Sequence, residues 1–499
     1  MKHRKIIIDA TVYTFAIYLI QPITIISSLF VRHALGPYLT GVVSTLSLFV
    51  YYASFSHLGV LSAAERDLPY YRGSGDMIRY NRIVSCSFTM TFWSGVLFAL
   101  GMIVWATISR SSLSKSLFLG ALIYALNIII VLWAAYYITL LRTSKQFVYL
   151  SKVQVIIGLV ASFGNAISAF LFGFEGLLVS TIFTGLLQAF LLTRFFGSIP
   201  SFKLDWLELK RLLLAGIPLL ILGLAMTGIK TIDNIMTLRF LGTEALGIYS
   251  IALMANNTIF SITNSLSVVL YPRMQEAYGK DSTIKSLISY VIRPSIIMGV
   301  LLPLLISVLF FLVPPVIYWL LPRFASGIPS FKLIAILSYF LAMFPMSVNF
   351  LVSMNKQLKV VAFLMAAIAI TYVLAKTFID AGWGLEGIAM AIGGGYIFCF
   401  ISINAHALSY WAKWKEIIRF LWDLSVPLLY SAILFVLLDR YVLQGNKNLI
   451  YAFFLGLLKV SIFCLFYVPL FFAMERKTRL ISDFIKPLII RTLHLRLTS

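Results

Sequence analysis

Charged side chains within apolar stretches are the residues of this sequence most able to do chemistry. One stretch carries both a base and an acid, Lys230 and Asp233, and four others carry a base: Arg293, Lys332, Lys376 and Lys459. An unpaired charge at the centre of a membrane helix costs roughly 2.5 to 3.5 kcal/mol on insertion scales. Because Asp233 is the one acid expected beside these bases, their excess predicts that an anion, itself a candidate substrate, accompanies them.

Lys230 and Asp233 form the most polar point of any apolar stretch, with Thr227, Thr231 and Asn234 beside them. Residues three apart share one face of a helix, so the two charges can pair. Two interpretations stay open. The pair is either a salt bridge that only offsets the energetic cost of burying its two charges, or a functional pair in which Lys230 attracts an anion. In the second case Asp233 holds the lysine in place or exchanges protons as an ion-coupling group.

Amides and one arginine complete the set of candidates. Asn256, Asn257 and Asn264 form a polar band suited to hydrogen-bonding either a polar substrate or a neighbouring helix. Arg32 closes the first apolar stretch, where a long side chain that reaches the membrane interface is the structural alternative. The same alternative applies to Arg293 and Lys376, and it is favoured for Lys332 and Lys459.

The elements that carry these residues are predicted to be membrane helices. Apolar residues make up 61% of the 499 positions and charged residues only 12%, far from the globular norm. About 20 apolar residues suffice to cross a bilayer. By this measure the sequence predicts an all-α polytopic protein with about fourteen spans, at 10–31, 38–61, 83–108, 117–141, 153–172, 176–197, 212–239, 245–270, 287–312, 331–353, 360–380, 384–409, 424–443 and 448–472.

The net charge of +22 has a topological explanation. Most of the 40 Lys and Arg fall in connections on the side of the amino terminus, which the positive-inside rule makes cytoplasmic. Both termini are therefore expected in the cytoplasm, and no nucleic-acid partner is expected. The anchors of the inner loops would be Arg66, Arg72, Arg79, Arg82, Lys203, Lys210 and Arg211.

Several other function classes have no support in the sequence. The three cysteines lie in or beside apolar stretches and the five histidines are scattered, so neither a disulfide framework nor a metal site is predicted. No Walker, HExxH or serine-elbow motif occurs, and we expect neither a cofactor nor catalysis. The first apolar stretch is too long for a cleaved signal peptide and is expected to remain as a helix.

An internal repeat organises the chain. Leu35, Gly36, Gly41 and Gly73 recur without a gap as Leu241, Gly242, Gly247 and Gly279. Such repeats in transporters usually flank the substrate site, so two units of six spans indicate transport. We expect an amino-terminal lobe at 1–205, a carboxy-terminal lobe at 206–415, two appended spans at 416–474 and a basic amphipathic tail at 475–499 lying on the membrane surface.

These features resemble a known family. The LGxxxxG turn, the loop RDLPYYRG (Arg66 to Gly73) with its partner PRMQEAYG (Pro272 to Gly279), the GxEG segments at 173–176 and 384–387, and the two extra helices are similar to those of one transporter branch. It is the polysaccharide transporter branch of the multidrug/oligosaccharidyl-lipid/polysaccharide (MOP) flippase superfamily, the Wzx-type O-antigen flippases. The resemblance implies a V-shaped pair of lobes around a cavity.

The same resemblance implies a function. The passenger would be an undecaprenyl-pyrophosphate-linked oligosaccharide, moved by alternating access across the bacterial inner membrane for O-antigen or other lipopolysaccharide synthesis. Implied partners are membrane lipids, a polysaccharide polymerase and a chain-length regulator. Cationic cavity residues of the family map loosely onto Arg32, Lys230, Arg293 and Lys376. The alternatives are a cation-coupled multidrug exporter of the same superfamily and a membrane glycan polymerase or glycosyltransferase.

Overall fold

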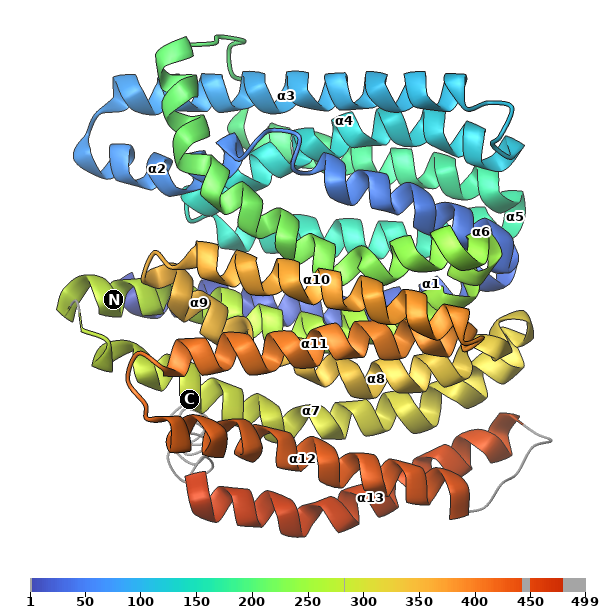
Figure 1. The fold of residues 1–499 in the computed structure, drawn as a ribbon. Coiled ribbons are helices and arrows are strands. Elements are labelled where there is room, and N and C mark those ends of the chain that lie inside the picture. The colour runs from blue at the N-terminus through green and yellow to red at the C-terminus, as the bar shows by residue number, and fades with distance from the viewer. Residues whose placement is uncertain (1, 282, 442–448, 479–499) are drawn as a thin grey trace, which may run out of the picture. The chain divides into compact units, whose positions relative to one another are not determined.

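The computed structural model is helical throughout the part it describes, which is residues 2–281, 283–441 and 449–478 (Figure 1). This confirms the predicted all-α polytopic architecture. Helix α13 ends at Thr478, and the rest of the predicted tail at 475–499 lies outside the described residues. Side chains are described from residue 20 onward, apart from 268–269, 279–282, 442–448 and 475–499.

The helices are long, and several contain more than one membrane pass. Eleven stretches among the described residues are long and apolar enough to cross a membrane. The helices of the described part are α1 (Lys2–Ala53), α2 (Val60–Ser74), α3 (Met77–Ile108), α4 (Lys115–Thr143), α5 (Phe147–Phe196), α6 (Trp206–Asp281), α7 (Lys285–Leu320), η1 (Pro322–Gly327), α8 (Ile328–Ala342), α9 (Pro345–Ser353), α10 (Gln357–Asp380), α11 (Gly384–Leu408), α12 (Trp414–Tyr441) and α13 (Leu449–Thr478), and all but α2 contribute to these stretches.

Glycines divide the three longest helices. The backbone leaves helical geometry at Gly36 in α1 (φ 72°, ψ 177°), at Gly173 in α5 (φ 61°, ψ −138°) and at Gly242 in α6 (φ 87°, ψ −180°). Positive φ is a conformation that glycine adopts without the steric penalty of a side chain. Each break separates two membrane passes, so the eleven stretches agree with the fourteen predicted spans.

The repeat seen in the sequence has a structural counterpart in these breaks. Gly36 and Gly242, which the repeat aligns, share nearly the same backbone angles. The first glycines of the two GxEG segments, Gly173 and Gly384, both have positive φ, at 61° and 52°. The repeat therefore marks positions where a membrane helix must end and the chain must turn back.

One predicted loop is a helix. Residues 66–73 were expected as a charged loop, but they lie in α2, which begins at Val60 after a turn at 54–59. Leu58 and Gly59 both have positive φ in that turn. Buried side chains Val60, Ala64 and Leu68 follow helical spacing, which explains why the segment packs as a helix despite its charge.

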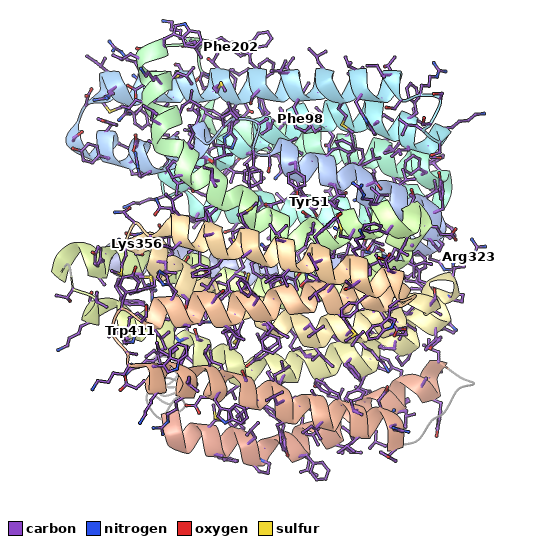
Figure 2. All side chains as sticks on the ribbon, viewed as in Figure 1. Tyr51, Phe98, Phe202, Arg323, Lys356 and Trp411 are labelled. Atoms are coloured by element: carbon purple, nitrogen blue, oxygen red, sulfur yellow. The ribbon has the colours of Figure 1, made fainter. Side chains whose placement is uncertain are left out.

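The chain forms two compact units, and their limits differ from those of the repeat. The first contains 1–250 and 357–388, and the second contains 251–356 and 389–499. The predicted lobe limits at 205 and 415 stay a prediction. In the second unit, Figure 2 shows Lys356 and Trp411 in connections at one end of the helices and Arg323 at the other, as expected for helices that run alternately up and down.

The two repeats meet at their glycine motifs inside the first unit. A Cβ added to Gly41 would lie 1.8 Å from the carbonyl oxygen of Thr243, and one added to Gly247 would lie 1.8 Å from that of Pro37. Each glycine thus faces the backbone of the other motif. Small residues permit such close approach of membrane helices, and here no larger residue fits.

We predict that Gly41→Ala destabilises the protein by about 1 to 3 kcal/mol or more, because the added methyl group overlaps a backbone carbonyl. Gly247→Ala should act in the same way. Gly101→Ala is the matched control, since a Cβ there meets no atom within 4 Å. Thermal unfolding of the purified proteins in detergent measures the effect; equal midpoints for Gly41→Ala and Gly101→Ala would contradict the close contact.

Candidate functional site

Arg32 is held by hydrogen bonds at the end of the first pass. Its Nε donates to the Ser250 hydroxyl at 3.0 Å, one terminal nitrogen to the Ser250 carbonyl at 3.2 Å, and the other to the Ser28 carbonyl at 3.0 Å. Ser250 lies beyond the break at Gly242, so Arg32 ties the first repeat to the second. A structural role accounts for these contacts without a ligand, and the substrate role stays a prediction.

Asp233 lies in the interior of the first unit and is 1% exposed. Its Oδ1 accepts the backbone N–H of Asn234 at 2.9 Å, and its Oδ2 accepts the Tyr249 hydroxyl at 3.1 Å. Tyr249 belongs to the next pass of α6, so this carboxylate connects the two sides of the break at Gly242. A buried carboxylate with two donors suits a coupling ion or proton.

Lys230 lies about one turn before Asp233 on α6 and is half-buried. The neighbouring Thr231 is 4% exposed, and its hydroxyl lies 2.9 Å from that of Tyr52 in the second pass. Lys230, Thr231 and Asp233 therefore lie within about one turn of α6, and Tyr52 of α1 reaches them through Thr231. Arg32 and Lys376 belong to the same compact unit, where Lys376 is exposed.

The predicted amide band divides into two kinds of residue, all in the second unit. Asn256 is 3% exposed; its amide nitrogen donates to the Tyr396 hydroxyl at 3.1 Å and its oxygen accepts the Ser338 hydroxyl at 2.7 Å. These bonds join α6, α8 and α11. Asn257 and Asn264 are exposed, as is Arg293 on α7. Asn256 therefore serves helix packing here, whereas the ligand role expected for Asn257, Asn264 and Arg293 stays a prediction.

Lys332 does not contribute to an excess of bases as the sequence suggested. Its Nζ lies 2.6 Å from Asp439 Oδ2 on α12 and 4.9 Å from the centre of the Phe310 ring. Lys459 on α13 is 8% exposed and interacts electrostatically with the same Asp439. Asp439 was overlooked as a second acid within the spans. For both lysines the sequence favoured a long side chain that reaches the membrane interface. The structure instead places them in an ion cluster that joins the appended helices to α7 and α8.

An ion cluster at the start of α6 was not predicted as a unit. Arg211 contacts Glu208, and it contacts Asp67 of α2 at 3.2 Å. Arg79 of α3 lies 3.4 Å from Glu208, and the Tyr71 hydroxyl accepts from Arg211 at 3.0 Å. The sequence showed these arginines only as loop anchors, because two of the pairs, Arg79 with Glu208 and Arg211 with Asp67, join residues more than a hundred positions apart. Arg82 with Asp205, and Arg66 with Asp67, extend the pairing.

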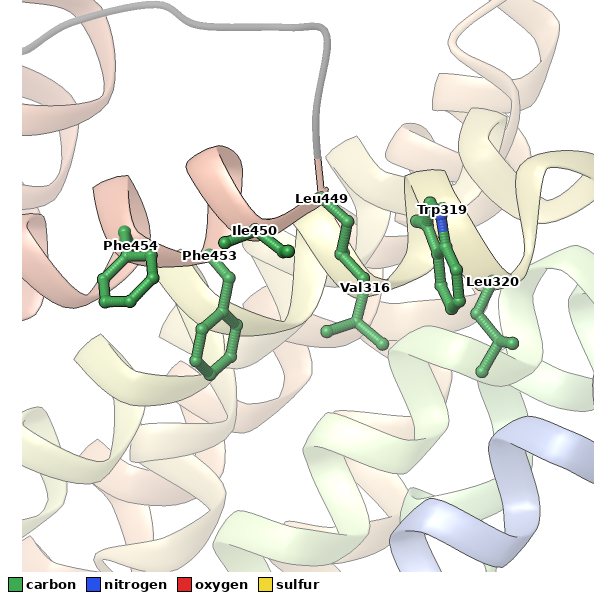
Figure 3. A pocket seen from close by; sticks show the side chains of 7 residues that line it. All are labelled: Val316, Trp319, Leu320, Leu449, Ile450, Phe453 and Phe454. Carbon is green, nitrogen blue, oxygen red and sulfur yellow. The ribbon is translucent and has the colours of Figure 1, made fainter.

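A cavity in the second unit does not coincide with the predicted site. It has a volume of about 310 Å³ between α7 and α13, and all its lining side chains are large and mostly apolar (Figure 3). The lining residues are Val316, Trp319, Leu320, Leu449, Ile450, Phe453 and Phe454. Such a lining suits hydrocarbon rather than sugar or phosphate. Among the described residues, no group of three or more His, Cys, Asp or Glu could hold a metal ion.

Comparison with known proteins gives one family-model match and several solved structures of the same fold. Residues 79–323 match the family model described as "Polysaccharide biosynthesis protein". No curated protein sequence gives a match. Solved structures with this fold include inward-facing and outward-facing conformations of a multidrug resistance MATE family transporter of the MOP superfamily. Their TM-scores are 0.63 and 0.62, their identities are 13% and 14%, and the matches cover 85% and 86% of this chain and 96% of each structure.

A third structure of this fold is a MOP superfamily transporter from Pyrococcus furiosus, with a TM-score of 0.59, 14% identity and coverage of 87% of this chain and 96% of that protein. At these identities the likeness concerns the fold. The chain therefore has the fold of these MOP superfamily transporters, and nearly half of it matches the polysaccharide biosynthesis family model. Its apolar helices make it a multi-pass membrane protein, and the inward-facing and outward-facing structures resemble its fold about equally, with TM-scores of 0.63 and 0.62.

We predict that Asn256→Leu lowers stability, because it leaves the hydroxyls of Tyr396 and Ser338 without their buried partner, at a cost of about 1 to 3 kcal/mol. Asn257→Leu, the adjacent and exposed position, should unfold at the same temperature as the unaltered protein. Thermal unfolding followed by size-exclusion chromatography compares the two. A larger loss from Asn257→Leu would reverse the assignment of packing and ligand roles.

Proposed function

We propose that this protein is a flippase that moves a polyprenyl-diphosphate-linked oligosaccharide across the bacterial inner membrane. The observation that carries the proposal is the match of residues 79–323 to a polysaccharide biosynthesis family on a chain with a transporter fold. Surface glycans are built on lipid carriers, so a transporter in such a family has a lipid-linked sugar as its natural passenger. Wzx-type transport of an O-antigen repeat unit on undecaprenyl pyrophosphate is the specific form proposed.

The chemistry of the passenger sets what the protein must supply. A diphosphate cannot enter hydrocarbon unaided, because the transfer of charge into low dielectric is too costly. Lys230, half-buried in a membrane helix, and Arg293, exposed on α7, are the proposed head-group ligands, with Lys376 as a third base. Asn257 and Asn264 present amides for sugar hydroxyls. The prenyl chain stays in the lipid while the head group crosses.

The transport cycle proposed is alternating access. Asp233 is the proposed ion-coupling residue, because its carboxylate bridges two passes through Tyr249 and would lose or alter that bond on protonation or ion binding. Both termini are placed in the cytoplasm by the distribution of basic loops. Membrane lipids, a polysaccharide polymerase and a chain-length regulator are the proposed partners.

A multidrug exporter is the second candidate, favoured by the fold it shares with MATE transporters. Membrane-buried carboxylates suit cationic drugs, and the first unit offers Asp233 as such a group. For the Pyrococcus furiosus transporter, reverse polarity of the binding pocket suggests a different function, so charge can separate functions within one fold. The exposed bases of this chain favour an anionic passenger. A membrane glycan polymerase or glycosyltransferase is a weaker alternative, without a catalytic motif.

We predict that Lys230→Ala and Arg293→Ala each reduce surface glycan at least about tenfold, the effect of losing roughly 1.4 kcal/mol of head-group binding. The measurement is glycan display in a bacterial strain that lacks its own flippase and carries the matching glycan genes. The proteins should reach the membrane in normal amounts, as judged by immunoblot.

The matched control is Arg194→Ala, which removes an exposed base near the end of α5, away from the proposed ligands. Lys230→Arg should retain part of the activity because it keeps the charge. Full activity of both alanine variants would refute this site. Resistance to cationic drugs, without any glycan display by the unaltered protein, would favour the exporter.

A further inference from the structure

The connection between α5 and α6 lies beside a membrane-crossing part of α3. The ring of Phe202 in this connection is 5.0 Å from that of Phe88 and 5.4 Å from that of Phe92. Figure 2 shows Phe202 at the edge of this unit, next to α3. Phe92 lies about 14 Å along the helix from the start of the apolar stretch 83–108. Since the hydrocarbon core is roughly 30 Å thick, Phe202 lies at the level of lipid and not of water.

The backbone of this connection is held against α3 by hydrogen bonds. The Thr89 hydroxyl donates to the carbonyl of Lys203 at 3.2 Å, and the Cys86 thiol donates to that of Asp205 at 3.9 Å. Irregular backbone at membrane depth is tolerated where other parts of the protein supply such partners. The connection is therefore a fixed part of the fold and not a loose loop in the cytoplasm.

The exposed side chains of this connection and of the first turns of α6 are largely apolar. On α6, Glu208, Leu209 and Leu212 are buried, whereas Leu207 and Leu214 are 82% and 65% exposed. A helix whose outer face meets water carries polar residues there. The other exposed apolar side chains are Ile199, Phe202, Leu204 and Trp206. We call residues 198–214 the interfacial segment, because exposed apolar side chains gathered in this way mark contact with a membrane or a protein.

The two acids of the interfacial segment already have arginine partners. Asp205 accepts the backbone N–H of Leu207 at 3.0 Å, which caps the start of α6, and its carboxylate lies 3.8 Å from Arg82 of α3. The Glu208 side chain is 8% exposed and pairs with Arg211. The carboxylates are thus used to hold the segment in place, and its exposed face keeps a positive charge.

Lys203 and Lys210 carry that charge, and both are exposed among the apolar side chains. A lysine stem can lie along apolar surface while its ammonium group reaches the level of lipid phosphates. In Figure 1 the first turns of α6 run across the direction of α3, as expected for a helix lying in the plane of a membrane surface.

We propose that the interfacial segment lies in the leaflet on the side of the basic loops, where Lys203 and Lys210 bind the phosphate groups of anionic phospholipids. The apolar side chains favour a membrane, because they begin at the depth of Phe92 on α3. The bases favour anionic over neutral lipid, because such lipids attract basic residues near the surface. The proposal depends neither on the identity of the passenger nor on the transport cycle.

Thermal unfolding of the full-length protein in neutral detergent tests the lipid specificity. Phosphatidylglycerol should raise the unfolding midpoint more than phosphatidylcholine, and soluble glycerol phosphate should leave it unchanged. Lys203→Gln with Lys210→Gln should raise the phosphatidylglycerol concentration needed for half of the effect at least about fivefold, since each base near an anionic surface contributes about that factor. The matched control is Lys145→Gln with Lys152→Gln, two exposed bases elsewhere in the same unit. Equal responses of the two double variants would overturn the phosphate site.

Spin labelling in nanodiscs tests the depth of the segment. Cys86, Cys399 and Cys464 are replaced by alanine, and Leu207→Cys and Lys145→Cys are labelled in separate samples. The label at 207 should be relaxed mainly by oxygen, which dissolves in lipid, and the label at 145 mainly by a water-soluble nickel complex. Equal access of the nickel complex to both labels would overturn membrane contact and indicate a surface for a protein partner.

A second depth measurement applies if the protein without cysteines does not fold. Fluorescence of the unaltered protein and of Trp206→Phe is compared in nanodiscs with and without brominated lipid. Trp206 is 74% exposed, so the unaltered protein should lose more fluorescence to the brominated lipid than the variant does. Equal losses would place Trp206 outside the lipid and overturn the proposal.

Discussion

The close approach of two backbones at Gly41 and Gly247 is the constraint on which the first unit depends. In a bilayer the helices gain no hydrophobic energy from each other, so packing contacts and polar bonds must hold them together. Here each glycine accommodates a carbonyl of the opposite repeat in the place of its own side chain. The contacts of Tyr52 with Thr231 and of Asp67 with Arg211 join the same two segments further along.

Burial in a medium of low dielectric also determines which charges need partners. Asp67, Glu208 and Lys459 are buried, and each interacts with a charge from another part of the chain. Lys332 and Asp439 are 107 positions apart and still within hydrogen-bonding distance. A charge inside the membrane is therefore not by itself evidence of a ligand, since the fold can bring its partner from far away.

These observations explain how far the sequence could be interpreted. The helical architecture and the repeat were predictable, because apolar length and glycine position are local properties that membrane insertion enforces. The ion cluster at Arg211 and the role of Asn256 were not, because both depend on contacts between distant segments. The helical conformation of α2 was missed since its charges were taken as the signal for a loop, whereas Val60, Ala64 and Leu68 are buried at helical spacing and Asp67 is buried with them.

Fewer bases than the sequence suggested remain as candidate ligands for an anionic passenger. Lys332 has its counter-charge in Asp439 and so needs no anion, whereas Arg32 is held by neutral groups of Ser28 and Ser250. Lys230, Arg293 and Lys376 are half-buried or exposed and can meet a charged head group at lower desolvation cost than fully buried bases. A passenger that moves must be released, and partly solvated bases bind a diphosphate weakly enough for that. The exposure of these bases therefore suits transport better than complete burial would.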